Sequence, residues 1–371
     1  MKVLIAPDKF KGTLTAAEVA EAMATGVRQV QPDYEVELLP LADGGEGTAA
    51  ILTQADEGSW TGARASDAMF RQVSCGYGVG FHGDMAFIDV AEASGWYRLT
   101  ERERNPLRTT TLGTGELMAV AMRNRCKTLV IGLGGSATID LGMGIMHGLG
   151  VRFYDKEKNL LSPMGGNLEK VHRIDHSTAH PRLPVTKMIL LTDVDNPLLG
   201  ENGALMFARQ KGLREADRSR MLAGMAHFAN LLEREFGVQT DLPGTGAAGG
   251  AALGCMALAR TKVQPGARYV MKTQEFRAAA KSADLILTGE GHLDAQTARG
   301  KVVAEVATQA AALGIPALAV AGTVTLAPQE IENLGLIRAT PLYPEAPPVR
   351  TSAREHRAAI VQAVAALLKN R

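Results

Sequence analysis

The chain begins MKVLIAPDKFKGTLT (residues 1–15), an apolar run that ends in one acid and two lysines. Residues 2–7 predict a β-strand that Pro7 ends, and Thr13 or Thr15 is suited to cap a helix over about residues 16–30. In open α/β sheets, ligands bind beyond the carboxyl ends of the strands. We therefore take Asp8, Lys9 and Lys11 as the first site candidates, with an ordinary solvated turn as the alternative.

Length and composition indicate a protein with a small-molecule substrate. The 371 residues suffice for two domains, and 40 Lys plus Arg nearly balance 39 Asp plus Glu. This balance argues against nucleic acid or an anionic membrane surface as partner. The cysteines, at positions 75, 126 and 255, form no CxxC pair. With no signal peptide or membrane span predicted, we expect a cytoplasmic protein; a homo-oligomer is left open.

Strand candidates at the two ends of the chain predict one parallel sheet. They alternate with helix candidates at 16–30, 301–313 and 351–369, and cover residues 2–7, 35–40, 285–288, 317–321 and 337–340. This alternation favours a flavodoxin-like sheet of order 2-1-3-4-5. Its switch point would bring the loop at 8–11 and the loop at 289–294 to one crevice.

The middle of the chain is expected to form an inserted α/β domain. We place the flavodoxin-like domain at 1–55 and 270–371 and the insertion at 56–269. Within the insertion, strands are predicted at 85–90, 128–131, 151–154 and 188–191, and helices at 115–123 and 215–236. An insertion next to the switch point predicts a ligand-binding cleft between the domains.

Two glycine-rich motifs have to be weighed against known nucleotide-binding signatures. GLGGSA (132–137) follows a predicted strand and reads G-x-G-x-x-A, with Asp155 about twenty residues on. This match leaves an NAD-binding alternative open, although further glycine and acid replace the expected helix start. PGTGAAGG (243–250) lacks a preceding strand, but as a helix N-terminus it could bind an anion. No GxxxxGK[ST] motif occurs, so a P-loop is not predicted.

Acids embedded among glycines form a second pattern. They occur in LADGGEGT (41–48), TDVDNP (192–197) and GEGHLD (289–294). Glycine lets the backbone approach phosphate, while a nearby carboxylate can hold magnesium or accept a proton from an attacking hydroxyl. Ordinary turns and helix caps are the structural alternative for any one loop.

These residues resemble the glycerate kinase family of bacteria over nearly the whole chain. The ordered matches are APDKFKG (6–12), ADGGEGT (42–48), NPLRTTTLGTGEL (105–117), GLGGSAT (132–138), DVDNPL (193–198), QKG (210–212), GAAGG (246–250) and TGEG (288–291). The resemblance implies a flavodoxin-like domain interrupted by a second α/β domain. It also implies ATP-dependent phosphorylation of D-glycerate to 2-phosphoglycerate, with 3-phosphoglycerate as the less favoured product.

The resemblance also suggests roles for the candidate residues, with ATP and Mg²⁺ as cofactors. Asp193 or Asp43 would accept the proton or hold magnesium, and Glu290 would be a further metal ligand. Lys9, Lys11 and Lys211 would neutralise phosphate or carboxylate. Other candidates for substrate or phosphate binding are Asp8, Gly44, Gly45, Glu46, Gly134, Gly135, Ser136, Thr138, His292 and Asp294.

Some positions depart from the pattern of that family. Ile139 stands where it usually has Asn, Leu141 where it has Gly, and His292 where it has Arg; Thr192, Asp195 and Arg209 also differ. Loss of an arginine removes a charged fork suited to carboxylate or phosphate. A kinase for a related small hydroxy acid, a non-catalytic sugar-acid sensor and an NAD-dependent oxidoreductase therefore remain as alternatives.

Overall fold

The structure is a computed structural model that describes the chain except for residues 296, 298–299, 344–350 and 370–371. The chain divides into two compact units, which we describe separately. The first comprises Met1–Asp43 and Pro265–Arg371, and the second comprises Gly44–Gln264. The sequence placed the division at 55/56 and 269/270. The first division falls earlier because helix α2 (Thr48–Ala55) packs on strands of the second unit. The second falls earlier because helix α8 (Gly266–Thr273) contacts α9 (Phe276–Lys281) and α10 (Val302–Leu313) of the first unit.

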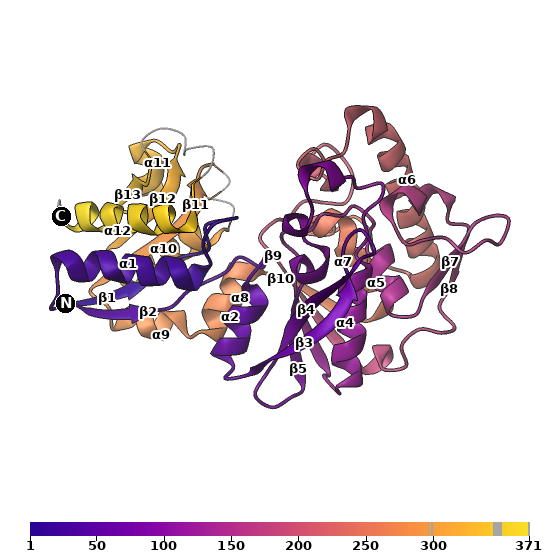
Figure 1. Ribbon diagram of the computed structural model, residues 1–371, viewed down its shortest axis with the longest axis horizontal. Helices are drawn as coiled ribbons and strands as arrows, with labels where there is room; N and C mark the ends of the chain where they lie inside the picture. Colours follow the sequence, from indigo (N-terminus) through magenta and orange to yellow (C-terminus); the bar gives the residue numbers. More distant parts are fainter. Residues whose placement is uncertain (296, 298–299, 344–350, 370–371) are drawn as a thin grey trace. The chain divides into compact units, whose positions relative to one another are not determined.

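The first unit is built on a parallel sheet of five strands (Figure 1). Its strands are β1 (Lys2–Ile5), β2 (Glu35–Leu38), β11 (Leu285–Leu293), β12 (Ala317–Val324) and β13 (Arg338–Pro341). They lie in the order β2-β1-β11-β12-β13, and every pair is parallel. Numbered within the sheet, this is 2-1-3-4-5, the order that the alternation predicts. The α/β fold class is therefore confirmed.

Helices cover both faces of this sheet. They are α1 (Ala16–Val30), α8 (Gly266–Thr273), α9 (Phe276–Lys281), α10 (Val302–Leu313), α11 (Pro328–Asn333) and α12 (Ala353–Lys369). Helices α1 and α12 lie side by side and share one core with β1, β11 and β12 (Figure 1). Gly26 allows this close approach, since a Cβ there would lie 2.7 Å from the Val361 carbonyl oxygen. Helix α10 contacts β11 and β12, and the first halves of these strands, residues 285–287 and 317–321, are apolar and buried.

Local signals explain where α1 begins. The Thr15 hydroxyl accepts a hydrogen bond from the Glu18 backbone N–H at 3.3 Å, and the Glu18 carboxylate accepts one from the Thr15 N–H at 2.9 Å. This reciprocal capping satisfies two helix-terminal donors. The observed bounds of α1 are those that the sequence predicts.

The second unit has a mixed sheet of six strands in the order β10-β9-β6-β5-β4-β3. Strands β5, β6 and β9 pair in parallel, and β3, β4 and β5 pair antiparallel. The strands are β3 (Ser59–Ser66), β4 (Gln72–Val79), β5 (Met85–Asp89), β6 (Thr128–Gly132), β9 (Lys187–Thr192) and β10 (Arg260–Pro265). A separate antiparallel pair joins β7 (Arg152–Tyr154) to β8 (Arg173–Asp175).

Besides α2, the second unit has five α-helices and several short 3₁₀ turns among its described residues. The α-helices are α3 (Val90–Ser94), α4 (Leu112–Arg123), α5 (Met143–Gly148), α6 (Glu215–Phe236) and α7 (Ala247–Leu258). The 3₁₀ turns are η1 (Trp96–Arg98), η2 (Glu101–Glu103), η3 (Gly165–Lys170), η4 (Leu183–Val185) and η5 (Ala204–Phe207). The sequence predicts α6 with these bounds, whereas α4 begins three residues earlier than expected.

Two departures from the resembled family lie in the core of the second unit. Ile139 and Leu141 are both fully buried in one apolar cluster. Leu141 has a φ of +52°, in the left-handed region that favours glycine. The glycine usual at this position therefore suits the backbone, and the leucine here combines an unfavourable φ with apolar burial.

We expect Leu141→Ala to destabilise the protein more than Leu141→Gly. Both variants lose the buried side chain, at about 2–5 kcal/mol, but only alanine keeps the cost of positive φ, about 1 kcal/mol. At Leu232, a buried position inside α6, the order should reverse, because glycine in a helix is less stable than alanine by about 0.5–1 kcal/mol. Urea unfolding of the four variants measures both differences. A glycine variant at 141 that is less stable than the alanine variant would contradict this account.

Candidate functional site

The first unit contains a cavity of about 360 Å³ at the carboxyl ends of β1 and β11. The backbone continues extended beyond β1, where the Asp8 N–H donates to the Gly289 carbonyl oxygen at 2.8 Å. This pairing places the two predicted segments side by side. The cavity is lined by the predicted residues Asp8, Lys9, Lys11, Asp43, Glu290 and His292.

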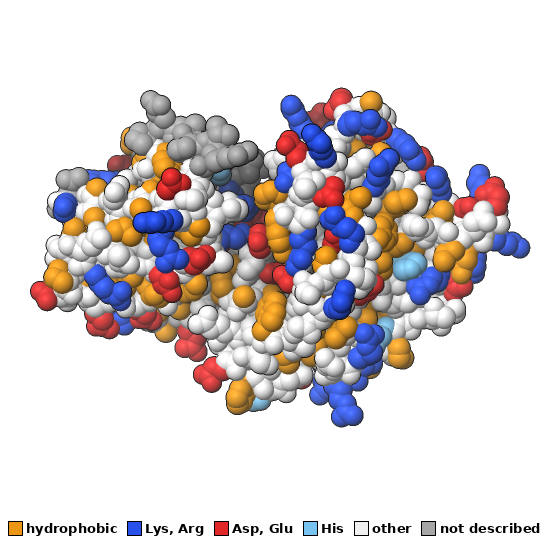
Figure 2. All heavy atoms as spheres, in the orientation of Figure 1, with side chains coloured by type: hydrophobic (Ala, Val, Ile, Leu, Met, Phe, Trp, Pro, Cys, Tyr) orange, Lys and Arg blue, Asp and Glu red, His pale blue; other side chains and the backbone are white. Residues whose placement is uncertain are grey.

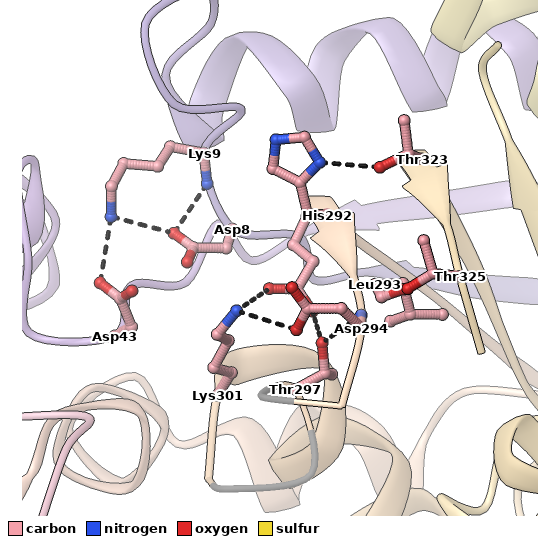
Figure 3. A network of polar contacts seen from close by, with 11 residues as sticks. Asp8, Lys9, Asp43, His292, Leu293, Asp294, Thr297, Lys301, Thr323 and Thr325 are labelled. Atoms are coloured by element: carbon pink, nitrogen blue, oxygen red, sulfur yellow. Dashed lines mark hydrogen bonds and ion pairs between the residues drawn. The ribbon is translucent and has the colours of Figure 1, made fainter. Parts of the chain in front are cut away.

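Lys9 joins the two aspartates of the cavity (Figure 3). Its Nζ lies 3.0 Å from Asp43 Oδ1 and 3.5 Å from Asp8 Oδ1, and all three side chains are buried. Burial raises the pKa of Asp8 to about 6, opposed by the charge of Lys9. The Lys9 ammonium thus offsets the charge of two carboxylates that are largely removed from water.

Glu290 is the third buried carboxylate of the cavity. The Thr297 hydroxyl donates to its Oε1 at 2.7 Å, and Lys301 Nζ lies 3.8 Å from its Oε2. Burial raises the pKa of Glu290 to about 7, and the nearby Asp8 and Asp43 add to the shift against the opposing charge of Lys301. Near neutral pH this carboxyl can therefore either hold or accept a proton.

His292 and Asp294 follow Glu290 along the chain. The sequence predicts a loop for both, but β11 extends to Leu293 because it pairs with β12 up to Val324. His292 therefore lies in the strand, whereas Asp294 lies in the loop after it. His292 is exposed, and its Nδ1 shares a hydrogen bond of 2.7 Å with the Thr323 hydroxyl (Figure 3). Asp294 Oδ1 lies 3.8 Å from Lys301 Nζ.

Glycines of the second unit allow two loops to pack together. The Gly134 N–H donates to the Gly44 carbonyl oxygen at 3.0 Å, and a Cβ on Gly134 would lie 2.7 Å from the Gly45 Cα. Gly135 lies nearby, since its Cβ would be 3.9 Å from that of the half-buried Glu46. Backbone packing is therefore one physical reason for these glycines.

The same unit joins Lys211 to the segment after β6. Its Nζ donates to the Ser136 hydroxyl at 2.8 Å and to the Thr138 carbonyl oxygen at 2.9 Å. Burial lowers the pKa of Lys211 to about 7, with Asp140 opposing the shift. Thr138 is fully buried, and its hydroxyl has no hydrogen-bond partner among the described residues. Of these two predicted hydroxyl donors, Ser136 therefore has a hydrogen-bond partner, whereas Thr138 has none among the described residues.

Asp193 lies in the loop after β9 and is half-buried. It belongs to the second unit and is not one of the residues that line the cavity of the first.

Two charged residues near these clusters were not predicted as site residues. Lys301 lines the cavity, although the Gly300-Lys301 pair lacks the earlier glycine and the hydroxyl of a P-loop and so did not mark it as a site residue. Asp140 is fully buried and accepts hydrogen bonds from the Thr111 N–H and hydroxyl at 2.7 and 2.8 Å. Burial raises the pKa of Asp140 despite these bonds. The sequence did carry a weak signal for each residue. Lys301 follows an acidic loop, and Asp140 lies within a glycine-rich segment.

The dinucleotide-binding alternative does not fit the second unit. Helix α5 begins only at Met143, well after the glycines that follow β6. The strand that precedes Asp155, β7, pairs with β8 in a separate sheet. The motif therefore does not form the compact βαβ unit that holds a pyrophosphate at a helix N-terminus.

Three further observations concern metal ligands, membrane-spanning helices and surface charge among the described residues. They contain no group of three or more His, Cys, Asp or Glu side chains arranged to hold a metal ion. No helix within the described part of the chain combines the length and apolar composition needed to cross a membrane. Basic and acidic side chains are interspersed on the face of each unit seen in Figure 2.

Comparison with known proteins places this chain in a family. The model of the Glycerate kinase family matches residues 3–370. A glycerate kinase of Halalkalibacterium halodurans is 37% identical over 92% of this chain and 90% of its own length. The glycerate 2-kinase of Escherichia coli K12 is 36% identical over 88% of this chain and 86% of its own.

A solved structure agrees with these relatives. The crystal structure of a protein assigned as glycerate kinase 2 from Salmonella typhimurium LT2 is 33% identical, with a TM-score of 0.81. The alignment covers 100% of this chain and 98% of that one. The chain therefore belongs to the glycerate kinase family, whose members are phosphotransferases with an alcohol group as acceptor.

Proposed function

We propose that this protein phosphorylates D-glycerate with ATP and Mg²⁺, and that 2-phosphoglycerate is the product. The observation that carries the proposal is the cavity beyond β1 and β11, where lysines and buried carboxylates from distant parts of the chain meet. The relative from Escherichia coli is named a glycerate 2-kinase, which supports phosphorylation of the 2-hydroxyl.

In-line phosphoryl transfer depends mainly on position and charge. Both substrates are anionic, so cationic groups must offset the carboxylate and the phosphates. We assign this role to Lys9 and Lys11 in the first unit and to Lys211 with Ser136 in the second. For the proton of the attacking hydroxyl we assign Asp43 or Asp193 as acceptor.

The carboxylates of the protein fit magnesium in its usual mode in kinases. Mg²⁺ is commonly bound by one or two carboxylates together with substrate phosphates, so it does not need a cage of protein ligands. Glu290 and Asp193 are our candidate ligands, and the raised pKa of Glu290 indicates a carboxylate that a nearby cation would stabilise in its ionised form. When bound, Mg²⁺ supplies neutralisation of charge on the phosphate oxygens.

We expect ADP formation to require Mg²⁺ and to prefer D-glycerate over L-glycerate and glycerol. Glycerol lacks the carboxylate, and loss of a charge-assisted hydrogen bond should lower kcat/KM at least about tenfold. A coupled ADP assay measures the rates, and ³¹P NMR of the product identifies the hydroxyl that is phosphorylated. Equal use of glycerol would contradict carboxylate binding. Tight NADH binding without ADP formation would favour an oxidoreductase instead.

We expect Asp193→Asn to lower kcat at least about a hundredfold, because it keeps the size of the side chain and removes the charge needed by a base or metal ligand. Asp195→Asn is the matched control, since Asp195 is exposed and lies two residues away; its kcat should stay within about twofold of the parent. Steady-state kinetics with D-glycerate measure both variants. An unchanged kcat in Asp193→Asn would remove Asp193 from both roles.

His292→Arg should lower KM for D-glycerate or ATP. Arginine adds a permanent charge and two parallel hydrogen-bond donors at the edge of the cavity, and we expect these to lower KM roughly fivefold to tenfold. His82→Arg, at an exposed position of the second unit, should leave both KM values unchanged. Should His292→Arg instead lose activity while the parent is active, the cavity depends on histidine. In that case related small hydroxy acids become the substrates to screen.

A further inference from the structure

Lys301 is a half-buried lysine of the cavity to which neither the sequence nor the proposed function gives a role. It immediately precedes α10, and only 19% of its side chain is exposed. Its ammonium points toward Asp294, which directly follows β11 (Figure 3). The same ammonium also lies near the carboxylate of Glu290. Lys301 therefore faces the same space as Lys9 and Lys11 but comes from a different element.

The contacts of Lys301 leave its donors available. Its Nζ lies 3.8 Å from both Glu290 Oε2 and Asp294 Oδ1, beyond hydrogen-bond distance. Among the described residues no hydrogen bond from this Nζ is found, whereas Lys9 Nζ lies 3.0 Å from Asp43. An ammonium has three donors and forms its strongest hydrogen bonds with anionic oxygens. Lys301 is thus held near acids by charge alone.

The place of Lys301 at the start of α10 does not itself favour a lysine. Lys301 is the N-cap residue of α10, where its side chain makes no capping hydrogen bond. A cation near the positive end of a helix dipole is unfavourable, while an anion there is favoured. An anionic ligand in the cavity would meet both the ammonium and this end of the helix.

We propose that Lys301 is a further anion-binding residue of this cavity, and that its ammonium moves from Glu290 and Asp294 to an anionic oxygen of a substrate. That oxygen belongs either to a phosphate of the nucleotide or to the carboxylate of the acceptor. This inference rests on the proposed function for the identity of the two substrates. The two acids keep the lysine charged and in place before the ligand arrives.

Isothermal titration calorimetry with ATP alone and with D-glycerate alone separates the two sources of the anion. Lys301→Gln should weaken binding of one ligand on the order of tenfold to a hundredfold, the range of a charge-assisted hydrogen bond. Lys301→Arg keeps the charge and should stay within about threefold of the parent. Lys272→Gln removes an exposed lysine of α8 away from the cavity, and both ligands should bind it as they bind the parent.

A second measurement uses the unaltered protein, so it does not depend on a variant that folds. Reductive methylation followed by mass spectrometry reports how accessible each lysine is, and saturating ligand should slow modification of Lys301 but not of Lys272. Unchanged dissociation constants in Lys301→Gln, an equal loss in Lys301→Arg, or equal modification with and without either ligand would each overturn the inference. Protection of Lys301 in a protein that forms no ADP would uphold the inference and reject the proposed reaction.

Discussion

The parallel pairing of β1 with β11 is the interaction on which the cavity depends. It joins Val3 to Leu285 and continues past β1, so that the Asp8 N–H reaches the Gly289 carbonyl oxygen. Closing so long a loop costs conformational entropy, which the apolar burial of both strands offsets. Asp8 and Glu290 become neighbours only because this register holds.

Burial of charge then sets the chemistry of the cavity. Three carboxylates are buried near one another, and the buried Lys9 and the half-buried Lys301 face them. Removing carboxylates from water disfavours their charged form, so the pKa values of Asp8 and Glu290 rise toward neutrality. Such groups respond strongly to any cation or anion that enters, which suits a site for charged substrates.

The second unit also has a lysine near a buried acid; burial lowers the pKa of that lysine, and other residues hold it in place. Lys211 is tied to Ser136 and to the Thr138 carbonyl oxygen, near a fully buried Asp140. The neighbouring glycines let two loops approach closely, so their presence reflects packing as well as any contact with phosphate. Family membership and these clusters agree on anionic substrates, while His292 marks the place where this chain departs from the resembled pattern.

The sequence by itself determined the elements whose signals are local. A capping threonine marks the start of α1, the helix expected at 215–236 has the bounds of α6, and alternation of strands and helices leads to the observed order of the parallel sheet. Tertiary structure decided the rest: the strands β3, β4 and β10 of the mixed sheet, the division after Asp43, and the roles open to Lys301 and Asp140. Those features depend on burial and on contacts between residues far apart in the chain, which short-range patterns do not encode.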